Sequence, residues 1–226
     1  MSITPYYLSL VDFNDPDDPI KKMCIPSIAE TDLSGSFDTS GEADNTVVTG
    51  VQHKYRETVI VLSTNHCAMY CRHCFRKRLV GLSDEEIAKY FDEMIEYIKE
   101  HKEISNVLIS GGDSFCNSNA KIEKYLRELI EIEHLDLIRF GTRIPVVYPQ
   151  RISKDYNLKK ILKSYCKKKQ IYVVTQFNHP REVTKEAKES IEALKEAGII
   201  VKNQTVLLKG VNDNSETLGK LLKKLT

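Results

Sequence analysis

Tryptophan is absent from this 226-residue chain, and so is any apolar run of about 18 residues, the length that a membrane-spanning helix requires. We therefore expect no membrane span. The chain also lacks an excess of one charge, because 33 Lys and Arg against 32 Asp and Glu leave a formal net charge of +1. The composition thus gives no reason to expect nucleic acid or an anionic membrane surface as a partner.

A secretory signal is missing as well. The first residues, MSITP, contain neither the charged n-region nor the apolar h-region of a signal peptide, so we predict a cytoplasmic protein. A reducing compartment suits the six cysteines, since disulfides are rare there. The length suits one substantial domain, or a barrel-type fold that is somewhat small.

Three of the six cysteines fall within eight residues, at Cys67, Cys71 and Cys74. They follow an apolar run at residues 59–64 that is typical of a buried strand, so one loop at a strand end carries three thiols. Thiolates at such spacing favour a soft metal centre: zinc, copper(I) or an iron–sulfur cluster.

The fourth ligand decides between these metals. Structural zinc commonly uses two pairs of closely spaced ligands, and no second pair follows here, although His66 or His73 could complete a zinc site. A four-iron cluster normally takes four thiolates, so a cluster held by three would keep one iron open for an exchangeable ligand. Cys24, Cys116 and Cys166 are isolated in the sequence, and no role is assigned to them.

The motif Cys67-X3-Cys71-X2-Cys74, with Tyr70 before its second cysteine, resembles the signature of radical S-adenosylmethionine (SAM) enzymes. With Arg76 and the neighbouring residues, it is similar to the lysine 2,3-aminomutase family, and the similarity runs from about residue 3 to the end of the chain. The resemblance implies a 4Fe-4S cluster whose open iron chelates the amino and carboxylate groups of SAM. An electron from a reductant such as flavodoxin or ferredoxin would then cleave SAM to methionine and a 5′-deoxyadenosyl radical.

The remaining pattern predicts an α/β fold with parallel strands. Helix 83–101 should begin with Ser83 as its N-cap and Glu86 completing a capping box. We expect a partial (βα) barrel of the radical SAM type, with about five βα units at 59–226, and an N-terminal extension at 1–58 that wraps it and is partly mobile over 31–50. The predicted strands are 59–64, 107–110, 137–140, 171–176 and 201–208, and the predicted helices are 83–101, 121–132, 157–168, 185–197 and one from about 215.

Polar residues and glycines gather where the predicted strands end, which is where such folds place their chemistry. Gly111 and Gly112 alone would indicate a tight turn that requires a positive φ. The resemblance instead places Gly111, Gly112 and Asp113 against the amino end of SAM, with Asp113 orienting either that ammonium or the loop. Ser114 departs from the family, which usually has proline there.

Other candidates follow from the resemblance. It implies that His73 and Gln204 lie near SAM and that Arg76 holds the α-carboxylate of an amino acid substrate, a group that a guanidinium can grip with two hydrogen bonds. From the residues alone, Arg76 could be exposed surface charge, His73 a hydrogen-bond donor to cluster sulfur, and Gln204 a solvent-facing strand residue. Weaker candidates, which could only pack loops, are Arg143, Asn178 and His179.

Aminomutases of this family also use pyridoxal 5′-phosphate (PLP), bound to a lysine in a glycine-rich segment that does not occur before Thr226. The last barrel strand of the family and the acidic residues that recognise a lysine side chain are also not found. Lys54 and Thr58 stand where the family is expected to have arginines facing the PLP phosphate. The chain is therefore either C-terminally incomplete, which we favour, or a member of a PLP-free branch.

The leading functional hypothesis is a radical SAM isomerase that moves an amino group between C2 and C3 of lysine or a similar amino acid. One alternative is another radical SAM reaction, including one on a protein-bound lysine. The alternative of another class is a binding domain stabilised by zinc or by a cluster. The sequence leaves a homo-oligomer open.

Overall fold

The computed structural model describes residues 1–32, 34–36 and 38–226, and its centre is one open sheet. Within the described part of the chain the sheet has seven strands in sequential order. β1, β2 and β3 pair antiparallel, and β3 to β7 pair parallel. The strands are β1 (Thr46–Val48), β2 (Val51–Tyr55), β3 (Thr58–Thr64), β4 (Asn106–Gly111), β5 (Leu137–Gly141), β6 (Gln170–Thr175) and β7 (Ile200–Asn203).

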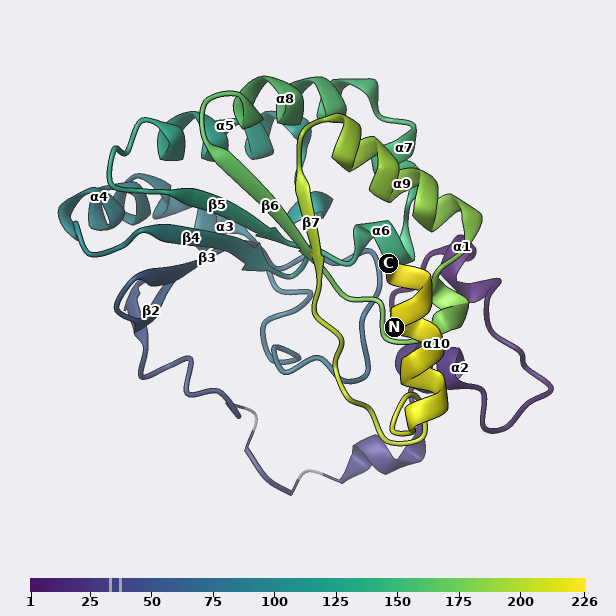
Figure 1. Ribbon diagram of the computed structural model, residues 1–226. Coiled ribbons are helices and arrows are strands. Elements are labelled where there is room, and N and C mark those ends of the chain that lie inside the picture. Colours follow the sequence, from purple (N-terminus) through teal and green to yellow (C-terminus); the bar gives the residue numbers. More distant parts are fainter. Residues whose placement is uncertain (33, 37) are drawn as a thin grey trace.

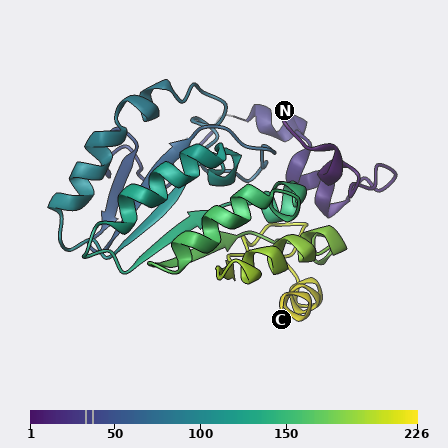
Figure 2. The same cartoon turned by 90° about the horizontal axis from the view of Figure 1, so that it is seen from above.

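Helices connect the parallel strands and form an arc outside the sheet (Figure 1). Figure 2 shows helices of this layer side by side over the strands. The α-helices are α1 (Pro5–Leu8), α2 (Pro19–Cys24), α3 (Glu85–Lys89), α4 (Phe91–Glu100), α5 (Asn119–Ile130), α6 (Ile144–Val147), α7 (Gln150–Ser153), α8 (Tyr156–Cys166), α9 (Lys185–Glu196) and α10 (Ser215–Leu225). Short 3₁₀ turns are η1 (Ile28–Thr31), η2 (Ser114–Cys116) and η3 (Pro180–Glu182).

Side chains that accept hydrogen bonds start the long connecting helices. Ser118, Asp155, Thr184 and Asn214 each accept a hydrogen bond from the backbone N–H three residues further on, at the first turns of α5, α8, α9 and α10. Such N-caps satisfy an otherwise unpaired N–H, which is why these helices begin at those residues.

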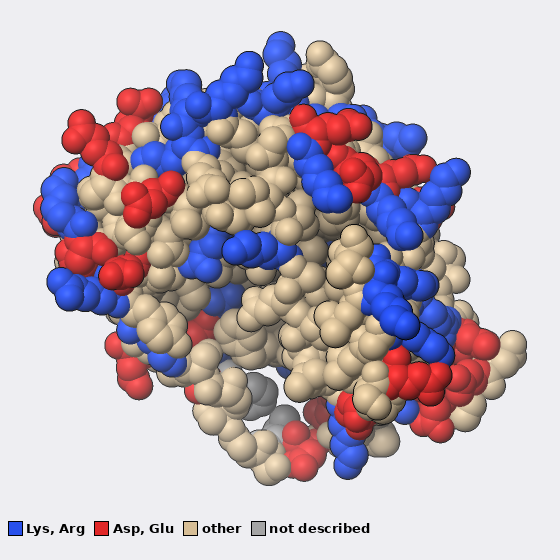
Figure 3. All heavy atoms as spheres, viewed as in Figure 1, with Lys and Arg blue, Asp and Glu red and all other residues tan. Residues whose placement is uncertain are grey.

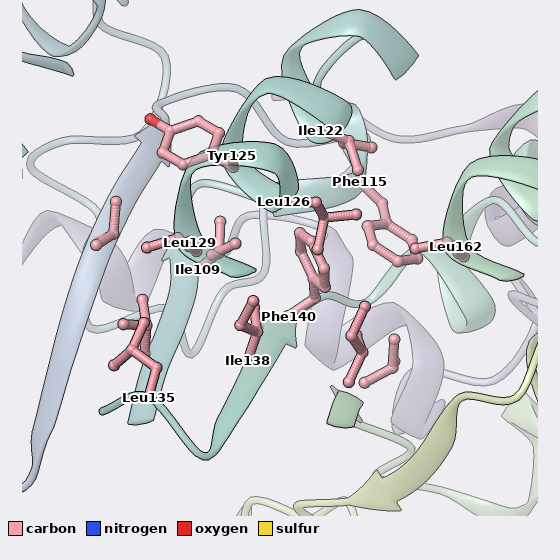
Figure 4. Packing of buried hydrophobic residues seen from close by; sticks show 14 of the residues in the cluster. Ile109, Phe115, Ile122, Tyr125, Leu126, Leu129, Leu135, Ile138, Phe140 and Leu162 are labelled. Carbon is pink, nitrogen blue, oxygen red and sulfur yellow. The ribbon is translucent and has the colours of Figure 1, made fainter. Parts of the chain in front are cut away.

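Alternation along the strands separates two faces of the sheet. In β4, Val107 and Ile109 are buried against the helices, whereas Leu108 and Ser110 line a cavity on the other face. The helix-facing side chains of β4 and β5 pack against α5 and the η2 turn, as Figure 4 shows for Ile109, Phe140 and Leu126 among others. The strand period of two thus directs one set of residues to the core and the other to the cavity.

The predicted α/β class and the partial barrel of five parallel βα units are confirmed. No strand was predicted before residue 59, but β1 and β2 extend the sheet there. Of the segment predicted to be extended and partly mobile, residues 33 and 37 lie outside the described residues.

The start of the predicted helix 83–101 was wrong. Asp84, not Ser83, is the N-cap of α3, and it makes no side-chain cap hydrogen bond. Its carboxylate instead accepts hydrogen bonds from Thr64 Oγ1 and Asn65 N, both at 2.6 Å. The helix is also interrupted at Tyr90, whose ψ of 14° lies outside the helical range and separates α3 from α4.

The last predicted strand was too long, because β7 ends at Asn203. The Asn203 side chain accepts a hydrogen bond from Phe177 N and donates one to Phe177 O. Thr205 Oγ1 donates to the same carbonyl. Side chains thus bond the backbone of the loop after β6, where a longer strand would have continued the ladder.

Figure 3 shows side chains of both charges on one face of the molecule, with uncharged atoms between them. In the part of the chain that the structure describes, no helix has both the length and the apolar character needed to cross a membrane.

Candidate active site

A cavity of about 740 Å³ opens at the carboxyl ends of the parallel strands, beside the cysteine loop. It is lined by every residue that the sequence analysis put forward for the cluster, SAM or the substrate: Cys67, Cys71, His73, Cys74, Arg76, Gly111, Gly112, Asp113 and Gln204. Arg143 also lines it, whereas Asn178 and His179 do not. The fold therefore brings residues from across 138 positions of sequence into one place, in the way that parallel αβ folds assemble their sites.

Three free thiols line this cavity. Cys67, Cys71 and Cys74 are partly buried and unpaired by disulfides. Burial raises the pKa of the Cys67 and Cys74 thiols. Among the described residues, no three Cys, His, Asp or Glu side chains gather as ligands of a single ion. An iron–sulfur cluster does not need such convergence, since its thiolates bind different irons.

The N-terminal segment fixes the backbone of the cysteine loop. Tyr70 N donates to Ser2 O and Arg72 N donates to Met23 O, both at 2.9 Å. Met69 is buried in the same apolar cluster as residues of α1 and α2. These contacts hold the cysteine loop at two points, one on each side of Cys71.

Arg143 lies two residues after the end of β5 and contacts the cysteine loop. Its Nη1 donates to Cys71 Sγ at 2.9 Å and its Nη2 donates to Glu182 Oε1 at 2.6 Å. Burial acts to lower the pKa of Arg143, but Cys71, Glu182 and Tyr7 raise it well above its ordinary value, so the guanidinium stays charged. Arg143 was a weak candidate in the sequence, and Glu182 and Tyr7 were missed. Glu182 stands three residues after His179, the spacing of a capping box, so the sequence could have indicated it. No local pattern near Tyr7 indicates its hydrogen bond to Glu182.

Gly111 and Gly112 are required by backbone packing. Gly111 has a φ of +117°, as the tight-turn interpretation predicts, and a Cβ there would lie 2.2 Å from Thr64 O. A Cβ on Gly112 would lie 2.3 Å from His66 O. The two glycines thus let the end of β4 close against the start of the cysteine loop.

Asp113 ties two strand ends together. Its carboxylate accepts hydrogen bonds from Thr142 Oγ1 at 2.5 Å and from Arg143 N at 2.7 Å, both after β5. Burial raises the pKa of this carboxyl group, although those hydrogen bonds oppose the shift. Of the two roles considered for Asp113, its present contacts are those of a residue that orients the loop.

Arg76 is buried, so it is not the surface charge that its Arg-Lys-Arg context alone suggested. Its Nε donates to Glu42 Oε1 at 2.6 Å, and Nη1 lies 3.3 Å from Ser110 Oγ on the cavity face of β4. The guanidinium therefore already holds one carboxylate at the cavity, the chemical group that an amino acid substrate would offer.

His73 and Gln204 both line the cavity, and His73 does so with unused hydrogen-bonding groups. Both ring nitrogens of His73 are buried and lack a partner within the described structure. Burial, with Arg143 and Lys77, lowers the pKa of His73 to about 3, so the ring is neutral near pH 7. Gln204 follows β7, where its backbone N donates to Thr175 O, and it lines the cavity as an exposed residue.

Lys54 and Thr58, the two positions considered for the phosphate of PLP, do not form a phosphate site at the cavity. Lys54 Nζ is exposed and donates to Ser40 O, and Thr58 is the first residue of β3, where its hydroxyl accepts from Asn106. Neither residue lines the cavity.

Comparison with known proteins then decides the family: the model of the radical SAM superfamily matches residues 61–222. The chain belongs to the radical SAM superfamily. This superfamily implies SAM and a 4Fe-4S cluster, and the three thiols, the unpartnered His73 ring and the cavity between them fit such a pair.

Relatives within the radical SAM superfamily cover nearly the whole chain. It is 43% identical to the L-lysine 2,3-aminomutase of Acetoanaerobium sticklandii over 228 residues, 100% of this chain and 54% of that protein. It is 41% identical to the glutamate 2,3-aminomutase of Clostridioides difficile over 99% of this chain and 52% of that protein. The L-lysine 2,3-aminomutase of Bacillus subtilis is 40% identical over 100% of this chain and 47% of its own length. The chain thus spans about half the length of these relatives.

Proposed function

We propose that the chain carries the catalytic centre of a radical SAM isomerase of the 2,3-aminomutase type. The observation that carries the proposal is that the three thiols, the guanidinium of Arg76 and the glycine turn after β4 line one cavity. When bound, a 4Fe-4S cluster and SAM would supply the electron transfer that cleaves SAM to a 5′-deoxyadenosyl radical, which abstracts hydrogen from the substrate.

In this proposal Cys67, Cys71 and Cys74 bind three irons and leave the fourth open. SAM occupies the cavity between the cysteine loop and the turn at Gly111 and Gly112. The ring of His73, whose two nitrogens are buried without a partner, and the amide of Gln204, which lines the cavity, supply hydrogen bonds to it.

The substrate class follows from Arg76 and from the names of the relatives, which act on lysine or glutamate. We propose an α-amino acid whose carboxylate takes the place of Glu42 on Arg76. The guanidinium is buried and close to Cys74 in the chain, so this placement puts the reacting carbons near the source of the radical. A role for PLP is part of this proposal only through the relatives, since neither Lys54 nor Thr58 lines the cavity.

Reductive SAM cleavage by the anaerobically reconstituted chain tests this function. With dithionite as reductant, we expect 5′-deoxyadenosine and methionine as products. Cys74→Ala should abolish their formation, whereas Cys166→Ala, at the end of α8 and outside the cavity lining, should retain it. Equal loss in both variants, or no cleavage by the wild type, would refute the proposal.

A further inference from the structure

The guanidinium of Arg143 joins the cysteine loop to the interior of the protein. All three of its donor groups are used, with Nη1 on Cys71 Sγ at 2.9 Å, Nη2 on Glu182 Oε1 at 2.6 Å and Nε on Gln176 O at 3.2 Å. Only 8% of the side chain is exposed. A guanidinium held by three partners in fixed directions has little freedom to leave the sulfur.

Glu182 is the group that fixes this orientation. It is fully buried, and besides Arg143 it accepts Tyr7 Oη at 2.6 Å, Asn178 N at 2.6 Å and His179 N at 3.0 Å. Tyr7 is itself fully buried in α1. A buried carboxylate is costly unless it is fully paired, and these hydrogen bonds pair Glu182 and fix its position.

A chain of contacts therefore runs from Cys71 through Arg143 and Glu182 to Tyr7. It connects the cysteine loop, the ends of β5 and β6, and the N-terminal helix. Neutralising Glu182 does not by itself require a contact with the thiol, because a guanidinium has enough donors to pair with the carboxylate from several positions. The contact between Arg143 Nη1 and Cys71 Sγ is therefore not explained by the pairing of Glu182 alone.

We propose that Arg143 is a positioning residue for the iron–sulfur cluster and sets its reduction potential, with Glu182 and Tyr7 holding the guanidinium on Cys71. This inference rests on the proposed function. Hydrogen bonds to ligand sulfur and nearby charge tune cluster potentials. Reduction adds one negative charge to the cluster, and a positive group on a ligand sulfur stabilises that state and raises the potential.

The test is a redox titration of the reconstituted cluster, followed by electron paramagnetic resonance. Arg143→Gln should lower the equilibrium constant for reduction about tenfold, which for a one-electron couple is about 59 mV. Arg143→Lys keeps the charge and loses the forked geometry, so its potential should fall between the wild type and Arg143→Gln.

The matched control is Arg139→Gln, which removes the same charge from β5, the strand that Arg143 follows. Arg139 bonds Asn106 at the start of β4, away from the strand ends that bear the site, and its loss should leave the potential unchanged. A purely structural role for Arg143 would change cluster content or thermal stability without moving the potential.

The outcomes separate this inference from the function beneath it. A wild-type chain that binds no iron and sulfide overturns both. If the wild type binds a cluster and Arg143→Gln has the same reduction potential, only the inference is overturned. If Arg143→Gln fails to hold a cluster, Arg143→Lys decides, and a wild-type potential in that variant overturns the inference.

Discussion

At the scale of single residues, the site depends on glycines at which a Cβ atom would clash with neighbouring backbone. Gly111 combines a φ of +117° with a Cβ position 2.2 Å from Thr64 O, and the strand pairing of Thr64 with Gly111 leaves the backbone no room to move. Gly219 in α10 has a helical neighbourhood and nothing within 4 Å of its Cβ position. The same substitution should therefore have opposite effects at the two sites.

We predict that Gly111→Ala lowers the free energy of unfolding by more than about 3 kcal/mol, from strain and a backbone clash. Gly219→Ala should raise it by about 0.5–1 kcal/mol, because alanine is the better helix former. Urea denaturation measures both values. Similar small effects at the two positions would show that the turn after β4 is not packed as described.

Residues also mark the limit of what the sequence predicts. Cys67, Cys71 and Cys74 are recognisable because their chemistry is local and their spacing is regular. Glu182 and Tyr7 are 175 positions apart, and only the fold brings them into one hydrogen bond. Arg76 is likewise buried against Glu42 and Gln52, and no local sequence pattern predicts that these residues contact it.

At the scale of elements, strands and long helices follow from the sequence because hydrophobic period and caps are local signals. The errors occur where tertiary contacts compete with those signals. Asp84 illustrates this, since its carboxylate joins the end of β3 to the start of α3 and does not cap the helix. β1 and β2 were missed because they are short and each contains exposed residues, without the apolar run that revealed β3.

The Asp84 junction predicts a pH dependence. Burial works to raise the pKa of Asp84, but hydrogen bonds from Thr64 and Asn65 and the Lys121 ammonium outweigh it and lower the pKa below 3.8. The stabilisation is therefore complete above pH 3.8 and is lost as the pH falls through the lower folded value.

We expect Asp84→Asn to cost about 1–3 kcal/mol at pH 7, the range for hydrogen bonds to a charged group. The difference in unfolding free energy between the wild type and Asp84→Asn should shrink below about pH 4, because the wild-type carboxylate becomes protonated and neutral. Denaturant titrations at several pH values measure it. A difference that stays constant to pH 2 would contradict the assignment.

At the scale of the whole molecule, a second apolar cluster unites the two ends of the described chain beside the site. It contains Tyr7 and Ile20 from the N-terminal helices, Met69 from the cysteine loop and Leu221 from α10. The site is thus supported by segments more than 200 positions apart. The sequence could identify α10 as amphipathic, but not the surface on which it packs.

Adjacent leucines in α10 test this arrangement. Leu221 is fully buried and Leu222 is 60% exposed. Leu221→Ala should cost about 2–5 kcal/mol of unfolding free energy, whereas Leu222→Ala should change it by less than about 0.5 kcal/mol. Equal costs would mean that the helix does not complete the cluster. Thermal and urea denaturation of the two variants decide between these results.

The central claim is that three thiolates hold a four-iron cluster with one iron left open. Iron and acid-labile sulfide, measured per chain after anaerobic reconstitution, test it most directly. We predict about four of each in the wild type, marked loss in Cys71→Ala and wild-type content in Cys166→Ala. One zinc per chain without sulfide, or full iron content in Cys71→Ala, would contradict the account.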